Sequence, residues 1–156
     1  MSHTSQLDNR YMEFLLGEQL FALPLMSVKE VIQRPDVTPV PNMPTHFEGM
    51  MNLRGQILGV FNVRKRLAAK ERKNKDSAHE VVVVIEHHGV SVGMLVDEVT
   101  KVLHPAADML KPAPIKHDDA ASKFIRSVIQ TGSEMVLTID VAELLEIEKY
   151  RQQMAG

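Results

Sequence analysis

A repeated order of parts is the feature that most constrains how this chain can fold. The segment VKEV (28–31) returns 68 residues later as VDEV (96–99), and each copy follows two short apolar runs that are joined by a turn. Each copy precedes a loop that contains prolines, then Phe47 or Phe124, then a further apolar run. Short strands with repeated turn signals favour small barrels or a sandwich over alternating strands and helices. We therefore expect two equivalent β-barrels that pack together.

Length and local composition predict how the repeat divides the chain. At 156 residues, the chain suits one domain, 1–156, made of two small halves that share a core. Residues 68–78 (AAKERKNKDSA) are highly charged and contain no large apolar side chain, which is typical of a solvated linker. We expect the first half at 11–67 and the second half at 79–145.

The last apolar run leads into a short helix. Asp140 is a suitable N-cap residue, and Glu143 follows three positions later, as in a capping box. We expect this C-terminal helix over residues 141–153. Upstream, residues 34–44 contain several prolines, and this segment must be extended or looped because proline lacks the backbone N–H that helices and sheets use.

Composition argues against several classes of partner. The net charge of −2 and the pI near 6.4 give no overall attraction to nucleic acid or anionic lipid. The longest aliphatic run, 81–85, is far shorter than the roughly 20 residues that a membrane-spanning helix needs. The basic cluster 64–66 continues into the charged linker without interleaved aromatic residues, so we interpret it as a solvated face. We expect a soluble protein that does not bind nucleic acid or insert into a membrane.

Residue combinations that support catalysis or metal binding are missing from the sequence. The adjacent His87 and His88 point to opposite faces of a strand, and the neighbouring carboxylates Asp97 and Glu98 point apart or into solvent. No GxSxG, HExxH, cysteine or glycine-rich phosphate loop occurs. We therefore expect no catalytic residue, no cofactor and no metal. The alternative is a ligand sensor or regulatory enzyme built on β-barrels, which would need a pocket where polar groups converge.

The segment Asn52-Leu53-Arg54-Gly55, between two apolar runs, indicates recognition. Arginine keeps its charge and offers five donors in a rigid fork, and Gly55 allows a turn with positive φ. Glu30, inside the first VKEV segment, is either a surface residue between core residues or the partner of a buried cation. The residues alone leave both alternatives open.

Several blocks of sequence, in order, resemble the chemotaxis coupling-protein family, CheW. These blocks are FLLGEQLFALPLMSVKEVI (14–32), the proline-rich lead-in at 40–49, NLRG (52–55) with NVRKRL (62–67), GMLVDEVTKVL (93–103) and MVLTIDVAELL (135–145). The resemblance extends over about residues 11–147, nearly the whole chain. A series of ordered blocks is far more specific than any single motif.

The resemblance implies a mostly β fold of two small packed SH3-like five-stranded β-barrels, the CheW-like fold, with a short C-terminal helix. It implies a non-enzymatic adaptor in bacterial chemotaxis that couples the cytoplasmic tips of transmembrane chemoreceptors to the regulatory domain of the histidine kinase CheA. The protein would be cytoplasmic and would reach membrane receptor arrays through these partners. A scaffold of the same type in a non-motility chemosensory pathway is the alternative.

The resemblance and the repeat together predict the binding residues. Glu30 and Arg54 match a characteristic pair of the family, and we expect them within salt-bridge distance. The repeat places five valines at equivalent edges of the two halves, where a groove would accept a receptor's helical hairpin: Val28, Val31, Val96, Val99 and Val102. The alternative is that all five lie in the core, as valines in strands usually do.

Overall fold

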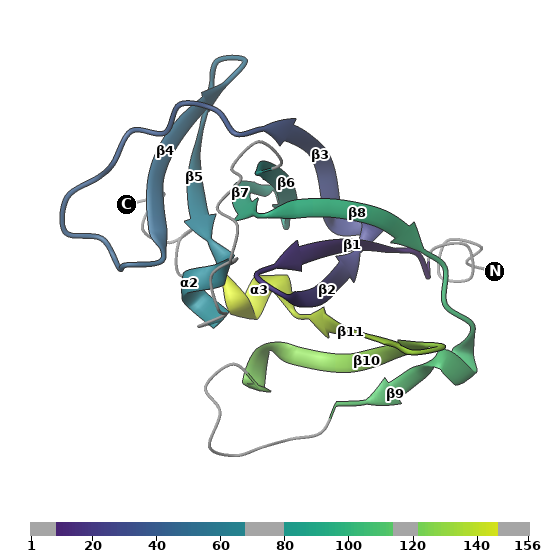
Figure 1. Ribbon diagram of the computed structural model, residues 1–156. Coiled ribbons are helices and arrows are strands. Elements are labelled where there is room, and N and C mark those ends of the chain that lie inside the picture. The colour runs from purple at the N-terminus through teal and green to yellow at the C-terminus, as the bar shows by residue number, and fades with distance from the viewer. Residues whose placement is uncertain (1–8, 68–79, 114–121, 147–156) are drawn as a thin grey trace.

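Strands dominate the fold (Figure 1). The structure of the protein, a computed structural model, describes residues 9–67, 80–113 and 122–146. The strands are β1 (Tyr11–Leu16), β2 (Gln19–Pro24), β3 (Val28–Gln33), β4 (Phe47–Leu53), β5 (Gln56–Asn62), β6 (Val81–His87), β7 (Val90–Val96), β8 (Glu98–Leu103), β9 (Leu110–Pro112), β10 (Ile125–Thr131) and β11 (Glu134–Ile139). The short helices are α2 (Val63–Leu67), α3 (Val141–Leu144) and the 3-10 turns η1 (Leu25–Ser27), η3 (Ala107–Met109) and η4 (Ser122–Phe124).

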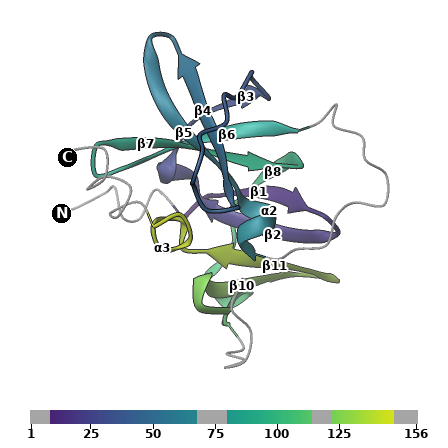
Figure 2. The same ribbon diagram turned by 90° about the vertical axis from the view of Figure 1, so that its left-hand side faces the viewer.

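Two sheets make up the molecule (Figure 2). They share the same arrangement of five equivalent strands, and β9 is added at one edge of the larger sheet. The six-stranded sheet has the order β8-β1-β2-β11-β10-β9, and the five-stranded sheet has the order β3-β6-β7-β5-β4. In each sheet one central pair is parallel, β2 with β11 or β7 with β5, and the other pairs are antiparallel. The predicted mostly β fold of two SH3-like units is confirmed, but within the described residues the units are open sheets rather than closed barrels.

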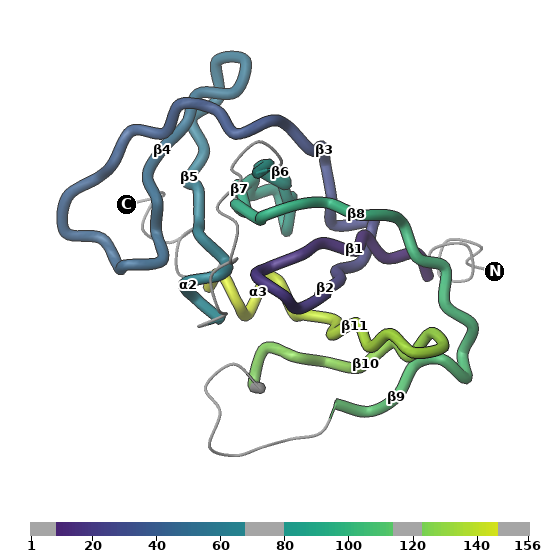
Figure 3. The backbone as a smooth tube through the Cα atoms, viewed as in Figure 1, coloured from purple at the N-terminus to yellow at the C-terminus, as the bar shows by residue number. Residues whose placement is uncertain are grey.

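Each sheet combines strands from both halves of the sequence (Figure 3). The hairpin of β1 and β2 joins strands β8 to β11, whereas the hairpin of β6 and β7 joins β3, β4 and β5. The expected division into 11–67 and 79–145 therefore does not follow the sheets, because each half contributes its first hairpin to the other half's sheet. The predicted linker, 68–78, lies outside the described residues.

The main core, a buried apolar cluster, lies between the two sheets. It includes Phe14 and Leu23 of the six-stranded sheet and Val83 and Met94 of the five-stranded sheet. Because side chains alternate along a strand, each sheet also has an opposite face with its own smaller cluster. These clusters contain Met51, Leu58, Val60, Val82, Val84 and Leu95 in the five-stranded sheet, and Ala22, Ile129 and Val136 in the six-stranded sheet.

Strand register shows which positions correspond in the two sheets. Glu13 lies opposite Ala22 in the first hairpin, and Val84 lies opposite Gly93 in the second. Each pair sits beside a bulge in the neighbouring outer strand, so the pairs are structurally equivalent at a spacing of 71 residues (84 − 13 and 93 − 22). The spacing of 68 between VKEV and VDEV is therefore three residues short of the structural repeat.

The C-terminal helix begins where the sequence predicts. The Asp140 side chain accepts a hydrogen bond from the Glu143 N–H at 3.2 Å, which caps α3. The described helix ends at Leu144, residues 145–146 form a turn rather than the predicted helix, and residues 147–153 lie outside the described residues. Within the described ranges, no helix has the length and apolar character that crossing a membrane requires.

Candidate protein-binding surface

The outer strands β3 and β8 each contain one extra residue relative to the strand beside them. In β3, the register against β6 shifts between Val28 and Glu30, which leaves Lys29 as the extra residue. In β8, the register against β1 shifts in the same way and leaves Thr100 extra. Such bulges redirect side chains at sheet edges, so both outer strands present their residues differently from a regular strand.

The bulge in β3 places two valines on one face. Residues three positions apart face opposite ways in a regular strand, so without the bulge Val28 and Val31 would diverge. With the extra residue, Val28 lies opposite Ile85 and Val31 lies opposite Val83. Ile85 and Val83 both belong to the main core, so the two valines lie along its border.

The bulge in β8 has the same effect on Val99 and Val102. Val99 lies opposite Phe14 and Val102 lies opposite Met12, and both partners belong to the main core. We call the four residues Val28, Val31, Val99 and Val102 the edge-valine surface. Figure 1 shows β3 and β8 on the same side of the molecule, as the free edges of the two sheets.

Exposure divides the five predicted valines. Val31 and Val102 are 41% and 53% exposed, so a partner can reach them. Val28 and Val99 are half-buried and pack against the main core. Val96 is 1% exposed and belongs to the main core, so a partner cannot contact it. The alternative in which all five valines are core residues is therefore wrong, because Val31 and Val102 are exposed.

The predicted pairing of Glu30 with Arg54 is confirmed. Nη2 of Arg54 donates a hydrogen bond to Oε2 of Glu30, and this bond and the carboxylate charge raise the pKa of Arg54. The Arg54 side chain is 69% exposed and that of Glu30 is 24% exposed. The interpretation of Glu30 as the partner of a buried cation is therefore wrong. The pair lies at the surface, one residue along β3 from Val31.

The segment from Asn52 to Gly55 forms the tight turn between β4 and β5. Arg54 and Gly55 have φ values of 49° and 88°, so both central residues are left-handed, as in the turns that best suit two-residue hairpins. The side-chain oxygen of Asn52 accepts a hydrogen bond from the Gly55 N–H at 2.8 Å. The positive φ predicted for Gly55 is confirmed, and the turn holds Arg54 where it can reach β3.

An ion pair with a buried carboxylate, between Asp97 and Arg64, is the feature that sequence reasoning missed. Asp97, between β7 and β8, is 4% exposed. Its carboxylate accepts a hydrogen bond from the Gly17 N–H at 2.6 Å and lies 3.0 Å from Nη1 of Arg64. Of the two expected directions for Asp97, apart from Glu98 or into solvent, the second is wrong, and the carboxylate joins the turn between β1 and β2 to helix α2. No local pattern identifies this pair, because the partners are far apart in sequence.

The basic cluster at 64–66 is structural. Nζ of Lys65 lies 3.2 Å from Oε1 of Glu48. The guanidinium of Arg66 donates a hydrogen bond to the Leu144 carbonyl at 3.0 Å and lies 4.9 Å from the centre of the Phe124 ring. The interpretation as a solvated face is therefore wrong for Arg64 and Arg66, whose side chains are 21% exposed and contact neighbouring elements, whereas Lys65 is 55% exposed.

Two titratable residues on either side of Phe47 have altered pKa values. Burial, followed by the positive charge of Arg66, lowers the pKa of His46 below its ordinary 6.5, although Glu146 acts in the opposite direction. Burial alone would raise the pKa of Glu48. Hydrogen bonds from Asn62 and Lys65 outweigh that effect, and the pKa of Glu48 lies below its ordinary 4.5.

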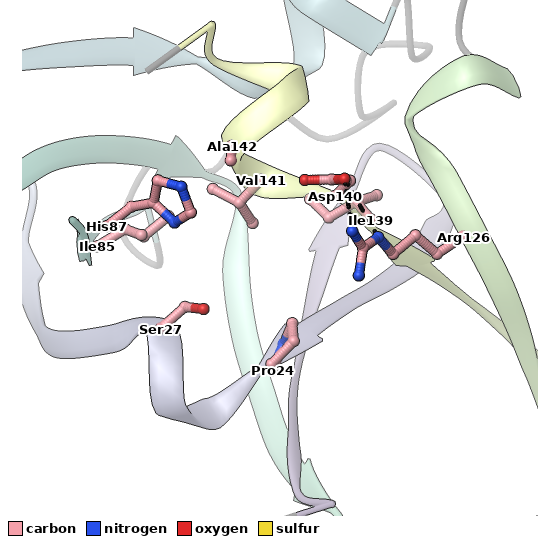
Figure 4. Close-up of a pocket in the computed structure, with 9 residues that line it drawn as sticks. All are labelled: Pro24, Ser27, Ile85, His87, Arg126, Ile139, Asp140, Val141 and Ala142. Carbon is pink, nitrogen blue, oxygen red and sulfur yellow. Dashed lines mark hydrogen bonds and ion pairs between the residues drawn. The ribbon is translucent and has the colours of Figure 1, made fainter. Parts of the chain in front are cut away.

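A pocket of about 160 Å³ lies where the two sheets meet near α3 (Figure 4). Its lining consists of Pro24, Ser27, Ile85, His87, Arg126, Ile139, Asp140, Val141 and Ala142. Three of these residues are of the types found in a catalytic triad, namely Ser27, His87 and Asp140. Figure 4 shows the Asp140 carboxylate directed at Arg126, and the two side chains are 2.9 Å apart.

The pocket lacks the geometry of a nucleophilic centre. Ser27, His87 and Asp140 make no hydrogen bond with one another in the described part of the chain, whereas a triad needs both bonds. Asp140 instead caps α3 and pairs with Arg126. Among the described residues, no group of three or more His, Cys, Asp or Glu is close enough to hold a metal ion.

Known proteins with related sequences and structures point to one family. The sequence-family model of the CheW-like domain matches residues 10–149 of this chain. The chemotaxis protein CheW of Treponema pallidum is 27% identical over 92% of this chain and 85% of its own length. That of Thermotoga maritima is 29% identical over 86% of each chain. The crystal structure of the scaffolding protein TtCheW from Thermoanaerobacter tengcongensis superposes with a TM-score of 0.79 at 27% identity, covering 92% of each chain.

Proposed function

The chain belongs to the CheW family, a family of chemotaxis scaffolds, and on that premise we propose that it couples transmembrane chemoreceptors to the histidine kinase CheA. One observation carries the receptor half of this proposal. Bulges in both outer strands turn Val28, Val31, Val99 and Val102 toward one border of the main core, where two of the four are exposed. This surface would be the receptor-binding site.

A helical hairpin is a suitable occupant of the edge-valine surface. Such a hairpin presents apolar side chains at i, i+3, i+4 and i+7, which need a shallow apolar surface rather than deep pockets. Valine side chains are short and have few rotamers, so the edge-valine surface loses little side-chain entropy when it is covered. The exposed pair of Glu30 and Arg54 lies beside it and would add polar contacts at the rim.

The kinase would bind elsewhere on the protein, through the regulatory domain of CheA. In this arrangement the protein is a cytoplasmic adaptor that reaches receptor arrays through its partners and carries out no chemistry of its own. Its output would be the relative position of receptor and kinase.

Co-sedimentation tests the proposal directly. Receptor-containing membranes and purified kinase are sedimented with and without this protein, and the kinase in the pellet is measured. The kinase should sediment with the membranes only when the protein is present. Equal amounts of kinase in both pellets would refute the coupling role.

A substitution at the edge-valine surface tests the site. Val102→Lys should leave the fold intact, because Val102 is 53% exposed, and should weaken receptor binding by about 2 kcal/mol, the scale of an interface hot spot. Val40→Lys is the matched control, since Val40 is 39% exposed but lies outside the edge-valine surface. Kinase binding should be unchanged in both variants. Equal receptor binding by the two variants would rule out this surface.

A further inference from the structure

We propose that Glu13 is a positioning residue for the edge-valine surface, because its buried carboxylate holds the bulge at Thr100 and thereby sets the direction of Val102. This inference rests on the proposed receptor-binding function. It concerns the part of β8 that lies one strand outside β1, at the free edge of the six-stranded sheet.

The contact between Glu13 and Thr100 is short and is shielded on the glutamate side. Glu13 is 2% exposed, although it is an acidic residue in the middle of a strand. The Thr100 hydroxyl donates a hydrogen bond to Oε1 of Glu13 at 2.6 Å and also lies 3.1 Å from the Glu13 carbonyl oxygen. Thr100 is the extra residue of the bulge, so this bond fixes the bulge itself to β1.

The fold does not require a carboxylate at this position. The equivalent residue in the five-stranded sheet is Val84, which is fully buried in an apolar cluster. Oε2 of Glu13 is buried and has no hydrogen-bond partner among the described residues. An unpaired buried oxygen destabilises a fold, so an apolar residue would serve stability better. A local departure of this kind is expected where a residue serves function.

A second polar contact of β8, between Lys101 and Glu134, is weak. Nζ of Lys101 lies 3.9 Å from Oε2 of Glu134, and both side chains are about half exposed. Exposed pairs of that kind contribute little to structure. The bond from Thr100 to Glu13 is therefore a stronger link between β8 and the rest of its sheet than this exposed ion pair.

Loss of the bulge would alter the receptor surface in a defined way. A shift of one residue in register turns every following side chain to the opposite face of a sheet. If Thr100 became an ordinary paired residue, Val102 would turn away from the border of the main core, while Val99 would keep its place opposite Phe14. The edge-valine surface would then lose its most exposed member.

Four variants test this role. Glu13→Val and Thr100→Val remove the bond, whereas Glu13→Gln and Thr100→Ser keep an acceptor and a hydroxyl at the same positions. Hydrogen exchange of the β8 amides should accelerate about tenfold in the first two variants only, with the β3 amides as internal reference. Receptor co-sedimentation should weaken by a similar factor, and kinase binding should not change. The melting temperature of Glu13→Val should equal or exceed that of the wild type.

The outcomes separate this inference from the proposed function. Wild-type exchange and wild-type receptor binding in Glu13→Val would overturn the positioning role. If Glu13→Val does not fold, Thr100→Val decides by the same two measurements. If the wild-type protein itself fails to bind receptors, the proposed function fails, but the exchange of β8 still reports whether Glu13 holds the bulge. Equal loss of binding in Glu13→Gln and Glu13→Val would also contradict a role for the bond.

Discussion

The two sheets have the same topology but fill one equivalent row of positions with different chemistry. Pairing across β1, β2, β11 and β10 aligns a row that is polar at three of its four positions, and pairing across β6, β7, β5 and β4 aligns an apolar one. These rows are Glu13, Ala22, Thr138 and Ser127 in the six-stranded sheet, and Val84, Gly93, Val60 and Gly49 in the five-stranded sheet.

The rows are stabilised in different ways. In the six-stranded sheet, the hydroxyl oxygens of Ser127 and Thr138 are 2.6 Å apart and share a hydrogen bond. In the five-stranded sheet, close approach replaces hydrogen bonding, since a Cβ added at Gly49 would lie 2.2 Å from the Thr38 carbonyl oxygen. One strand order therefore fixes which positions meet, but it leaves open whether they meet through polar groups or through packing.

Exchanging the chemistry of the rows should have the largest effect in the apolar sheet. Val84→Glu introduces at position 84 the residue type of its equivalent, Glu13, in the six-stranded sheet. It should lower the free energy of unfolding by about 5 kcal/mol. Where the six-stranded sheet has Thr100, this sheet has Lys29, whose ammonium already lies 3.6 Å from the Glu86 carboxylate. The introduced carboxylate therefore lacks the hydroxyl partner that Glu13 has. Urea denaturation of Val84→Glu measures this loss.

Ile57→Glu is the control for that exchange, because Ile57 lies in the same sheet and is 52% exposed. It should change the free energy of unfolding by no more than about 0.5 kcal/mol. A loss below about 2 kcal/mol in Val84→Glu would show that the two rows are interchangeable.

The second exchange concerns packing. Gly49→Ser introduces the side chain that Ser127 has in the other sheet, and the clash with Thr38 together with the φ of +148° should lower stability by about 3 kcal/mol. Gly55→Ser separates the two causes, since its φ is +88° but nothing lies within 4 Å of an added Cβ. That control should lose about 1 kcal/mol. Thermal melts that rank the variants in the reverse order would contradict the close-packing explanation.

The third exchange makes the sheets alike in their response to pH. His46 and Phe124 are equivalent, since their carbonyl oxygens accept from the N–H groups of Asn62 and Asp140 at 2.7 and 2.8 Å. The lowered pKa of His46 means that the unfolded chain takes up its proton first as pH falls through 6.5. The contribution of His46 to the free energy of unfolding is therefore complete above pH 6.5 and declines below it.

His46→Phe should remove this part of the acid sensitivity. Melting temperatures of the wild type should fall more steeply than those of the variant between about pH 7.5 and pH 5.5. Glu48 adds a separate loss below 4.5, because its pKa is also lowered and the unfolded chain again binds the proton first. Parallel pH profiles for wild type and His46→Phe would exclude His46 as the source.

The smallest effect should come from the turn that carries Arg54. The corresponding turn of the other sheet contains Gly132 with a φ of 57°, so Arg54→Gly makes the two turns more alike. The loss of the pair with Glu30 and the relief of a left-handed arginine act in opposite directions. The melting temperature should change less than in the exchanges above, whereas partner binding should weaken. A melting temperature lowered as far as in Gly49→Ser would show that the exposed pair supports the fold.

Local patterns in the sequence predicted elements and caps well, because these depend on near neighbours. The turn at Arg54 and Gly55 and the cap at Asp140 follow from two to four adjacent residues. Contacts between distant segments were not predictable in this way. Nothing near Asp97 in the sequence indicates Arg64, and nothing near Glu13 indicates that a bulge at Thr100 would bury its carboxylate.

The repeat predicted equivalence but not its register. VKEV and VDEV align at a spacing of 68, yet pairing makes Val28 equivalent to Val99 and Val31 equivalent to Val102, at a spacing of 71. The letters alone could not show this, because VTKV (99–102), the true structural counterpart of VKEV (28–31), shares fewer letters with it than VDEV (96–99) does. The same offset explains why Val96 lies in the core although it heads its segment.

The exchange of hairpins between the sheets has a consequence for how the protein is made. During synthesis, β1 and β2 leave the ribosome long before β8 and β11, which are their partners in the finished sheet. The β1 edge of this hairpin therefore stays unpaired until β8 appears, and its β2 edge stays unpaired until β11 appears. Contacts this distant in sequence make folding slow. The nascent chain is thus most vulnerable to aggregation or proteolysis just before its final strands are added.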